Sequence, residues 1–209
     1  MKKLAIAMAL CMLLLWVLSL FAVAEDTAFD LGRLEGTAYV NADMGITFQA
    51  SGFSGMEQYY AEDALDETNG CAWNDAGAIQ DKLEAGETLV CYVFVDVSMR
   101  VAGAINGIRI TVQNVREGKE DPELALLEES KADMETQAKE YGFNVEKAEM
   151  GEMDFAGSVR PCLSMDMENN GRHKQMLFVT IPADERVYQI AFDMDASEVA
   201  GYASHFSVR

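Results

Sequence analysis

Cys162 and His173 are the two residues of this chain best suited to form a nucleophile and base pair. Such catalysis needs a thiol or hydroxyl next to a group that accepts its proton, and the only histidines are His173 and His205. The segment "MENNG" between Cys162 and His173 is typical of a turn, so neighbouring strands could bring the pair together. A thiol ionises readily only in electropositive surroundings, and the residues around Cys162 in the sequence are acidic. We therefore expect a structural thiol and keep an extracellular hydrolase as an alternative.

Carboxylates are abundant, and several pairs could serve acid–base chemistry or bind a hard cation such as Ca²⁺. The pairs are Asp193 with Asp195, Asp166 with Glu168, and Glu62 with Asp63. Among 35 acidic residues such pairs arise by chance, and no D-x-D-x-D-G loop is present. Solvated surface is the favoured interpretation, and we expect no metal or other cofactor. A hydrolase that uses carboxylates and a low-affinity Ca²⁺-binding protein are the alternatives.

Tyr59, Tyr60 and Trp73 are the candidates for a ligand or partner surface. They cluster near the first expected helices, and aromatic rings with polar tips can line a groove for a sugar or a peptide. The same side chains could instead complete a core.

No G-x-S-x-G nucleophile elbow is present, and the glycines of "GAING" lack the lysine of a phosphate-binding loop.

The N-terminal segment is typical of an export signal. Lys2 and Lys3 precede an apolar run at 4–21, and "AVA" ends at Ala24. This order predicts cleavage after Ala24, so residues 1–24 are a signal peptide. The run is also close to the roughly 20 residues that span a bilayer, which leaves an uncleaved membrane anchor as the alternative. We expect a secreted protein or one at the cell-envelope exterior, with no membrane contact after cleavage.

Charge and cysteine number narrow the classes of partner. The net charge is −19 at pH 7, and 35 acidic residues stand against 16 basic ones. Such a surface repels nucleic acid, because phosphate binding requires lysine and arginine. We therefore expect the partner to be an unknown protein, or a cationic or small-molecule ligand.

Cys71, Cys91 and Cys162 stay in the mature chain, and their odd number permits one disulfide or none.

The elements that would position these residues begin with a hairpin. "GTAYVNADMGITFQASGF", residues 36–53, alternates apolar and polar residues on either side of a cluster of turn formers, as two paired strands do. Residues 54–70 predict an acidic helix and 75–85 a second, short one. Residues 25–35 are expected to be a short polar leader. One domain would then cover 36–209.

The middle of the chain predicts two strands and a long helix. The apolar segment 88–98 is typical of a strand buried on both faces. Residues 107–115 alternate, with Arg109, Thr111 and Gln113 outward, and Asn106-Gly107 before them is a hairpin-type turn signal. Residues 122–141 carry an apolar stripe at helical spacing, which predicts a helix laid on a sheet.

The C-terminal half switches to a period of two. Residues 143–153, 157–167, 173–181 and 186–194 predict four successive strands, and their short connections require antiparallel neighbours. A closing helix is expected near the C-terminus. The whole pattern predicts one α+β domain, with an antiparallel sheet of about six or seven strands flanked by helices as an α/β/α sandwich.

Several short motifs resemble those of exported proteins common in anaerobic Gram-positive bacteria. In the first hairpin they are Tyr39 with Asn41, and "GITF" at 45–48; after the long helix the motif is "FAG" at 155–157. Taken in this order, the chain from 36 to 209 resembles the fold of the photosystem protein PsbP and the Ran-binding protein Mog1. "QASGF" stands where that pattern has a proline and a tryptophan.

The resemblance implies a fold and a general class of function, and it carries no catalytic residues. Where a role is known, members of this fold act as accessory or binding proteins. Together with the export signal, this predicts a non-catalytic binding or accessory protein that works outside the membrane. Its ligand and oligomeric state are left open by the sequence.

Overall fold

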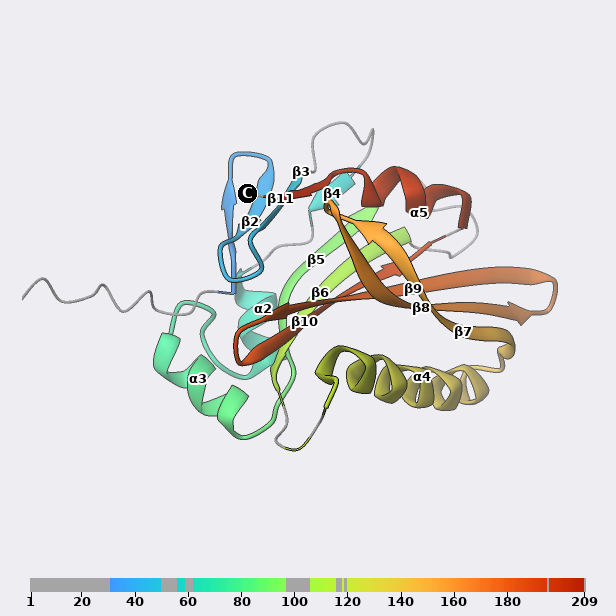
Figure 1. Cartoon of the computed structure of the whole chain (residues 1–209), viewed down its shortest axis with the longest axis horizontal. Helices are drawn as coiled ribbons and strands as arrows, with labels where there is room; N and C mark the ends of the chain where they lie inside the picture. Colours follow the sequence, from blue (N-terminus) through green and yellow to red (C-terminus); the bar gives the residue numbers. More distant parts are fainter. Residues whose placement is uncertain are drawn as a thin grey trace, which may run out of the picture.

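The computed structural model describes residues 31–49, 56–58, 62–96, 106–115, 118, 120–194 and 196–208. Its largest element is an antiparallel sheet of seven strands in the order β4-β5-β6-β10-β9-β8-β7 (Figure 1). In this order the strands are Met56–Gln58, Leu89–Asp96, Asn106–Asn114, Arg186–Asp193, Arg172–Ala183, Ser158–Asn169 and Asn144–Phe155. The predicted antiparallel sheet of six or seven strands is confirmed.

Two-residue turns join the four strands β7 to β10, which is why their pairing follows the sequence order. Between β8 and β9, Asn169 is paired with Arg172. Asn170 and Gly171 form the turn with φ of 53° and 81°. Positive φ at both central residues is the type I′ geometry, whose twist matches that of the paired strands. The predicted run of four antiparallel strands is therefore correct.

A second sheet of four strands was not predicted. Its order is β1-β2-β3-β11, with β1 at Arg33–Glu35, β2 at Ala38–Asn41, β3 at Ile46–Gln49 and β11 at Phe206–Val208. β2 and β3 form the predicted hairpin. The expectation of a polar leader at 25–35 is wrong for its described part, because β1 pairs with β2 and Leu31 is 1% exposed. The folded domain therefore begins before residue 36.

Four helices complete the described chain. They are α2 at Glu62–Asn69, α3 at Ala76–Glu84, α4 at Pro122–Glu140 and α5 at Ala196–Ala203. The helix predicted over 54–70 is only partly correct, because Met56–Gln58 pairs with the end of β5 as a strand. The turn predicted at Asn106-Gly107 is wrong as well, since both residues belong to β6.

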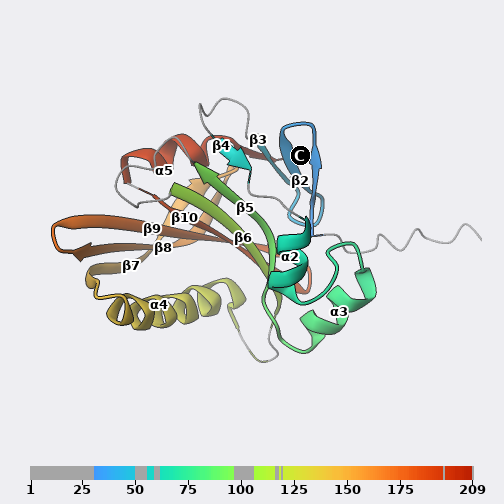
Figure 2. The ribbon, with the colours of Figure 1, turned by 180° about the vertical axis from the view of Figure 1, so that it is seen from behind.

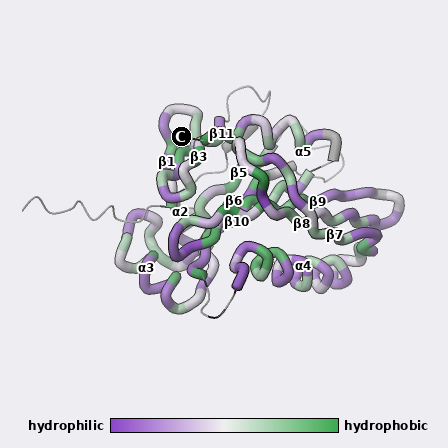
Figure 3. Tube along the Cα trace, viewed as in Figure 1, coloured by the Kyte–Doolittle hydropathy of each residue, from purple (hydrophilic) through white to green (hydrophobic). Residues whose placement is uncertain are grey.

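The large sheet carries a different layer on each face (Figures 1 and 2). On one face an aromatic core joins it to the small sheet, α3 and α5, with Phe48, Ile79 and Tyr202 among the buried contributors. On the other face α4 packs mainly on β7, β8 and β9, around Leu127 and Leu163. Figure 3 shows the hydrophobic centre of the large sheet. None of the helices within the described ranges is long and apolar enough to cross a membrane.

Candidate functional site

A groove runs between α4 and the part of the large sheet that α4 leaves open. The helix packs mainly on β7, β8 and β9, and residues of β5, β6 and β10 line the groove beside it. The groove has a volume of about 660 Å³. Small-molecule sites typically occupy roughly 300–1,000 Å³, so the space is large enough for a ligand of ordinary size.

The floor of the groove is a row of side chains across four strands. Val93 of β5 is paired with Arg109 of β6, Arg109 with Ala191 of β10, and Ala191 with Phe178 of β9. Directly paired residues point to the same face of a sheet, and all four line the groove. The sequence correctly assigned Arg109 to the face away from the main core. It did not show that this face is the floor of a groove.

Gly107 keeps the floor open next to Arg109. It lies on β6 between Val95 and Asp193 and leaves a gap in the side chains that line the groove. A Cβ atom at this position would come within 2.9 Å of the Phe94 carbonyl oxygen, closer than two such atoms can approach. The glycine is therefore needed by the pairing of β5 with β6.

One side of α4 forms the wall of the groove. The Asp121 side chain accepts a hydrogen bond from a first-turn backbone N–H, and Pro122 follows it, which sets where the helix begins. Leu126, Ser130 and Met134 then follow at spacings of four residues, so they fall on one side of the helix and line the groove.

The lining is apolar in its middle and adaptable in shape. Met134, Met167 and Met176 contribute from α4, β8 and β9, together with Phe143 and Phe178. Methionine is unbranched and fills irregular apolar space readily. Such a lining suits a flexible apolar ligand better than a rigid, strongly polar one.

Polar side chains in the lining are mostly paired with one another. Gln189 Nε2 donates to Ser130 Oγ at 2.8 Å, which ties the floor to the helix. Lys174 Nζ on β9 lies 2.8 Å from Asp193 Oδ2 on β10. The Arg109 side chain has no ion-pair or hydrogen-bond partner within the described ranges.

The alternative in which Cys162 pairs with His173 does not occur, and the expected structural thiol agrees with the structure. Cys162 is paired with Val179 in the β8–β9 ladder, whereas His173 is paired with Glu168. Six ladder positions separate them, or about 20 Å along the strands. Burial raises the pKa of the Cys162 thiol, and the charge of Glu152 adds to this, so the thiol is protonated at neutral pH. Cys162 is 8% exposed, as expected of a structural residue.

The carboxylate pairs that the structure describes are engaged with other groups. Asp166 accepts a hydrogen bond from Gln175, Glu168 accepts one from the Gly171 backbone, and Asp193 is held by Lys174. The side chains of Glu62, Asp63 and Asp195 lie outside the described residues. In the described part of the chain, no three metal-binding side chains come together. Cys71, Cys91 and Cys162 form no disulfide within the described part of the chain.

Of the three predicted surface aromatics, only Trp73 can be placed. It is partly exposed, and its backbone N–H donates to Asp66 Oδ1 at 2.7 Å. It follows α2 and is not among the residues that line the groove. Tyr59 and Tyr60 lie outside the described residues, so an aromatic surface around Trp73 stays a prediction.

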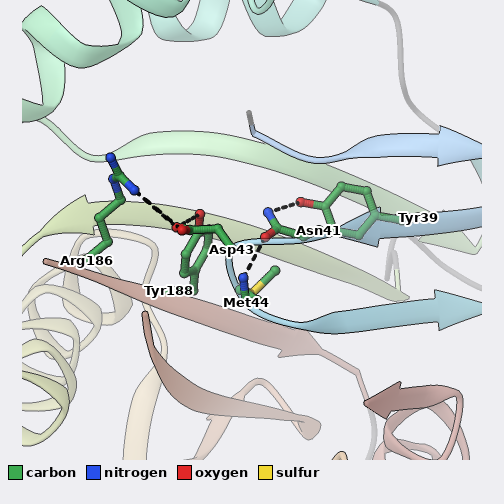
Figure 4. Close-up of polar contacts among 6 residues, drawn as sticks. All are labelled: Tyr39, Asn41, Asp43, Met44, Arg186 and Tyr188. Carbon is green, nitrogen blue, oxygen red and sulfur yellow. Dashed lines mark hydrogen bonds and ion pairs between the residues drawn. The ribbon is translucent and has the colours of Figure 1, made fainter. Parts of the chain in front are cut away.

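The Tyr39 and Asn41 motif proves to be structural (Figure 4). Tyr39 Oη donates to the Leu31 carbonyl at 2.6 Å, and Asn41 Nδ2 donates to Tyr39 Oη at 3.2 Å. Asn41 also accepts from the Met44 N–H at 2.8 Å, which closes the β2–β3 turn. These bonds hold the first hairpin against the segment that precedes it.

Asp43, in the same turn, joins the hairpin to the large sheet (Figure 4). Tyr188 Oη donates to Asp43 Oδ2 at 2.6 Å, and Arg186 Nη1 lies 3.4 Å from the same oxygen. Burial raises the pKa of Tyr188 far above its usual range, and neighbouring Cys91 and Asp43 raise it further. The phenol is therefore protonated and acts as a hydrogen-bond donor.

Comparisons with known proteins leave the family open. No protein-family model and no curated protein matches the chain. Among solved structures, cyanobacterial PsbP from Synechocystis is similar over 86% of this chain and 99% of its own, with 14% identity and a TM-score of 0.48. LpqN, involved in cell envelope biogenesis of Mycobacterium tuberculosis, is similar over 58% of this chain and 84% of its own, with 13% identity and a TM-score of 0.35.

A protein of unknown function from Pseudomonas aeruginosa, a putative regulator, is also similar. It covers 71% of this chain and 89% of its own, with 14% identity and a TM-score of 0.29. PsbP is the family that the sequence resembles. The functional assignment is based on the groove.

Proposed function

We propose that this protein is an exported, non-catalytic binding protein that holds a small molecule with an apolar body in the groove beside α4. The observation that carries the proposal is the open floor formed by β5, β6 and β10, with methionine and phenylalanine side chains around it. Apolar side chains that line an open groove are exposed to water, and a ligand that covers them gains about 25 cal/mol per Å² of apolar area.

Two observations support binding over catalysis. The best candidate nucleophile, Cys162, is buried, protonated and far from His173 along the ladder. In the described part of the groove, the charged side chains are Arg109, the Lys174–Asp193 pair, and two acids of α4. The export signal and the resemblance to exported proteins of anaerobic Gram-positive bacteria support a place outside the membrane.

The proposal is tested by titrating the purified mature protein with a neutral fluorophore, N-phenyl-naphthylamine. We expect saturable binding to one site. Ala191→Phe places a ring on the floor and should weaken binding by at least about tenfold, since each 1.4 kcal/mol of lost contact is a factor of ten.

The matched control is Ala132→Phe, because Ala132 is exposed on α4 and does not line the groove. Its affinity for the fluorophore should equal that of the wild type. Absence of saturable binding, or equal affinities of the two variants, would show that the groove is not a binding site.

A further inference from the structure

We infer that the ligand of the groove is an amphiphile with a single negative charge, such as a long-chain carboxylate, whose head group pairs with Arg109. This inference rests on the proposed function and adds the chemical class of the ligand. It follows from one cation on the floor, the charges around it, and the apolar path that leads away from it.

Among the described residues Arg109 has no counter-ion, although the chain has a large excess of acids. Within the described ranges no carboxylate is ion-paired with it, although the chain has 35 acidic and 16 basic residues. Its direct cross-strand neighbours, Val93 and Ala191, are apolar, and the diagonal neighbour Asp193 is paired with Lys174. A guanidinium binds a carboxylate through two parallel hydrogen bonds, so Arg109 is suited to hold an acidic head group.

The other cation of the groove is already neutralised. Lys174 Nζ lies 2.8 Å from Asp193 Oδ2, and both residues line the groove. Their pair leaves Arg109 as the cation that can attract a ligand within the described lining.

The acids on the wall limit the charge that a ligand can carry. Glu129 and Asp133 of α4 line the groove opposite the floor. Like charges repel one another, so these carboxylates would disfavour a ligand with several negative charges. One charge, placed at Arg109 on the floor, satisfies the cation and leaves the rest of the ligand uncharged.

The apolar side chains extend from Arg109 far enough for a long chain. Met167 lies on β8, three strands away from Arg109 on β6. The cross-strand partner of Met167 on β9 is Lys174, which is four residues along β9 from Phe178 in the floor row. Strand spacing and rise then place Met167 about 20 Å from Arg109. Met134, Met176 and Phe178 line the groove between these ends or beside them, and they can pack around a flexible acyl chain.

The experiment compares dodecanoate with dodecanol, which have the same chain and differ in charge. Each competes with the neutral fluorophore for the purified mature protein, below the concentration at which micelles form. We expect dodecanoate to bind at least about tenfold more tightly, because a hydrogen bond to a charged group is worth about 1.5–3 kcal/mol. Added salt should reduce this ratio, because it screens the head-group attraction.

Arg109→Gln should bring the ratio of the two affinities close to one, and Arg109→Lys should give an intermediate ratio. The matched control is Arg33→Gln, since Arg33 lies on β1 and pairs with Glu35; its ratio should equal that of the wild type. A wild-type ratio of one, or a ratio unchanged by Arg109→Gln, would overturn the anionic class while leaving the binding groove intact. Failure of both compounds and of the fluorophore to bind would overturn the proposed function itself.

Discussion

Glu123 is a half-buried carboxyl group on α4 whose surroundings disfavour its charge. Burial raises the pKa of the Glu123 carboxyl above its usual range, Arg160 partly opposes this, and Asp121 adds to it. A carboxyl with a raised pKa in the folded state holds its proton more tightly there than in the unfolded chain. Its contribution to stability is therefore complete at low pH and is lost as pH rises through the folded-state pKa.

Glu123→Gln removes this loss, because the amide carries no charge at any pH. Relative to the wild type, we expect the variant to gain in melting temperature as pH rises from about 4, near the ordinary pKa of glutamate, to 7. Thermal unfolding followed by circular dichroism across this range measures the difference. Glu128→Gln is the control, since Glu128 is exposed on the same helix. A difference between Glu123→Gln and wild type that does not change with pH would contradict the account.

Helix α4 shows how an element can be predicted correctly while its buried side is misassigned. The helix begins and ends as expected. Helical spacing predicts a packed stripe that includes Leu124 and Tyr141. These side chains are 39% and 73% exposed, whereas Leu126 is 9% exposed. The helix lies over β7 to β9 and beside a groove, so two different sides of it meet apolar neighbours. Periodicity alone describes one stripe and cannot separate the two.

Strand β5 shows how an edge is protected by a neighbouring helix. β4 pairs only with the last residues of β5. Near the start of β5, the Asn69 side chain makes the hydrogen bonds that a neighbouring strand would make. Asn69 Oδ1 accepts from the Val90 N–H at 2.8 Å, and Nδ2 donates to the Val90 carbonyl at 3.0 Å. Unpaired strand edges invite association with other chains, so this residue shields the edge where α2 ends.

Asn69→Ala leaves both backbone groups of Val90 without these partners. The expected cost is about 1–3 kcal/mol of unfolding free energy, the penalty for a buried group left without its hydrogen bond. Hydrogen exchange should show faster exchange at the Val90 amide, and urea unfolding should show the loss of stability. Asn74→Ala serves as control, because Asn74 is exposed. Slow exchange at Val90 in Asn69→Ala would count against the edge-protecting role.

The two sheets pack together partly because the C-terminal strand β11 pairs with β3 near the start of the domain. β11 pairs with β3, so Phe206 lies beside Phe48 with ring centroids 4.4 Å apart. The Phe206 ring is also 4.8 Å from Phe155 and 5.9 Å from Phe192, both of the large sheet. This aromatic cluster joins the small sheet to the large one, and Phe206 is 4% exposed within it.

Phe206→Ala should therefore destabilise the whole protein rather than only its last residues. Removing a buried phenylalanine costs about 3–5 kcal/mol, and we expect a single unfolding transition at a lower denaturant concentration. Val208→Ala, on the same strand but 64% exposed, should change stability little. Equal effects of the two substitutions, or the appearance of a second transition in Phe206→Ala, would show that the sheets do not unfold together.

The sequence by itself determined the local features whose cause lies within a few residues. The four strands from β7 to β10 follow from a period of two and from turn residues such as Asn170 and Gly171, because a two-residue turn requires antiparallel neighbours. The start of α4 follows from Asp121 and Pro122 in the same way. The outward direction of Arg109 follows from alternation along β6.

Tertiary structure alone decided which distant segments meet and what covers each face. The pairing of β11 with β3 joins residues far apart in the chain, so no local pattern could reveal the second sheet. Cys162 and His173 lie on adjacent strands, yet their ladder positions keep them apart. The groove exists because α4 packs mainly on β7, β8 and β9, beside the lining side chains of β5, β6 and β10. An outward side chain such as Arg109 becomes part of a site only through that placement, since packing between elements depends on contacts that sequence spacing does not contain.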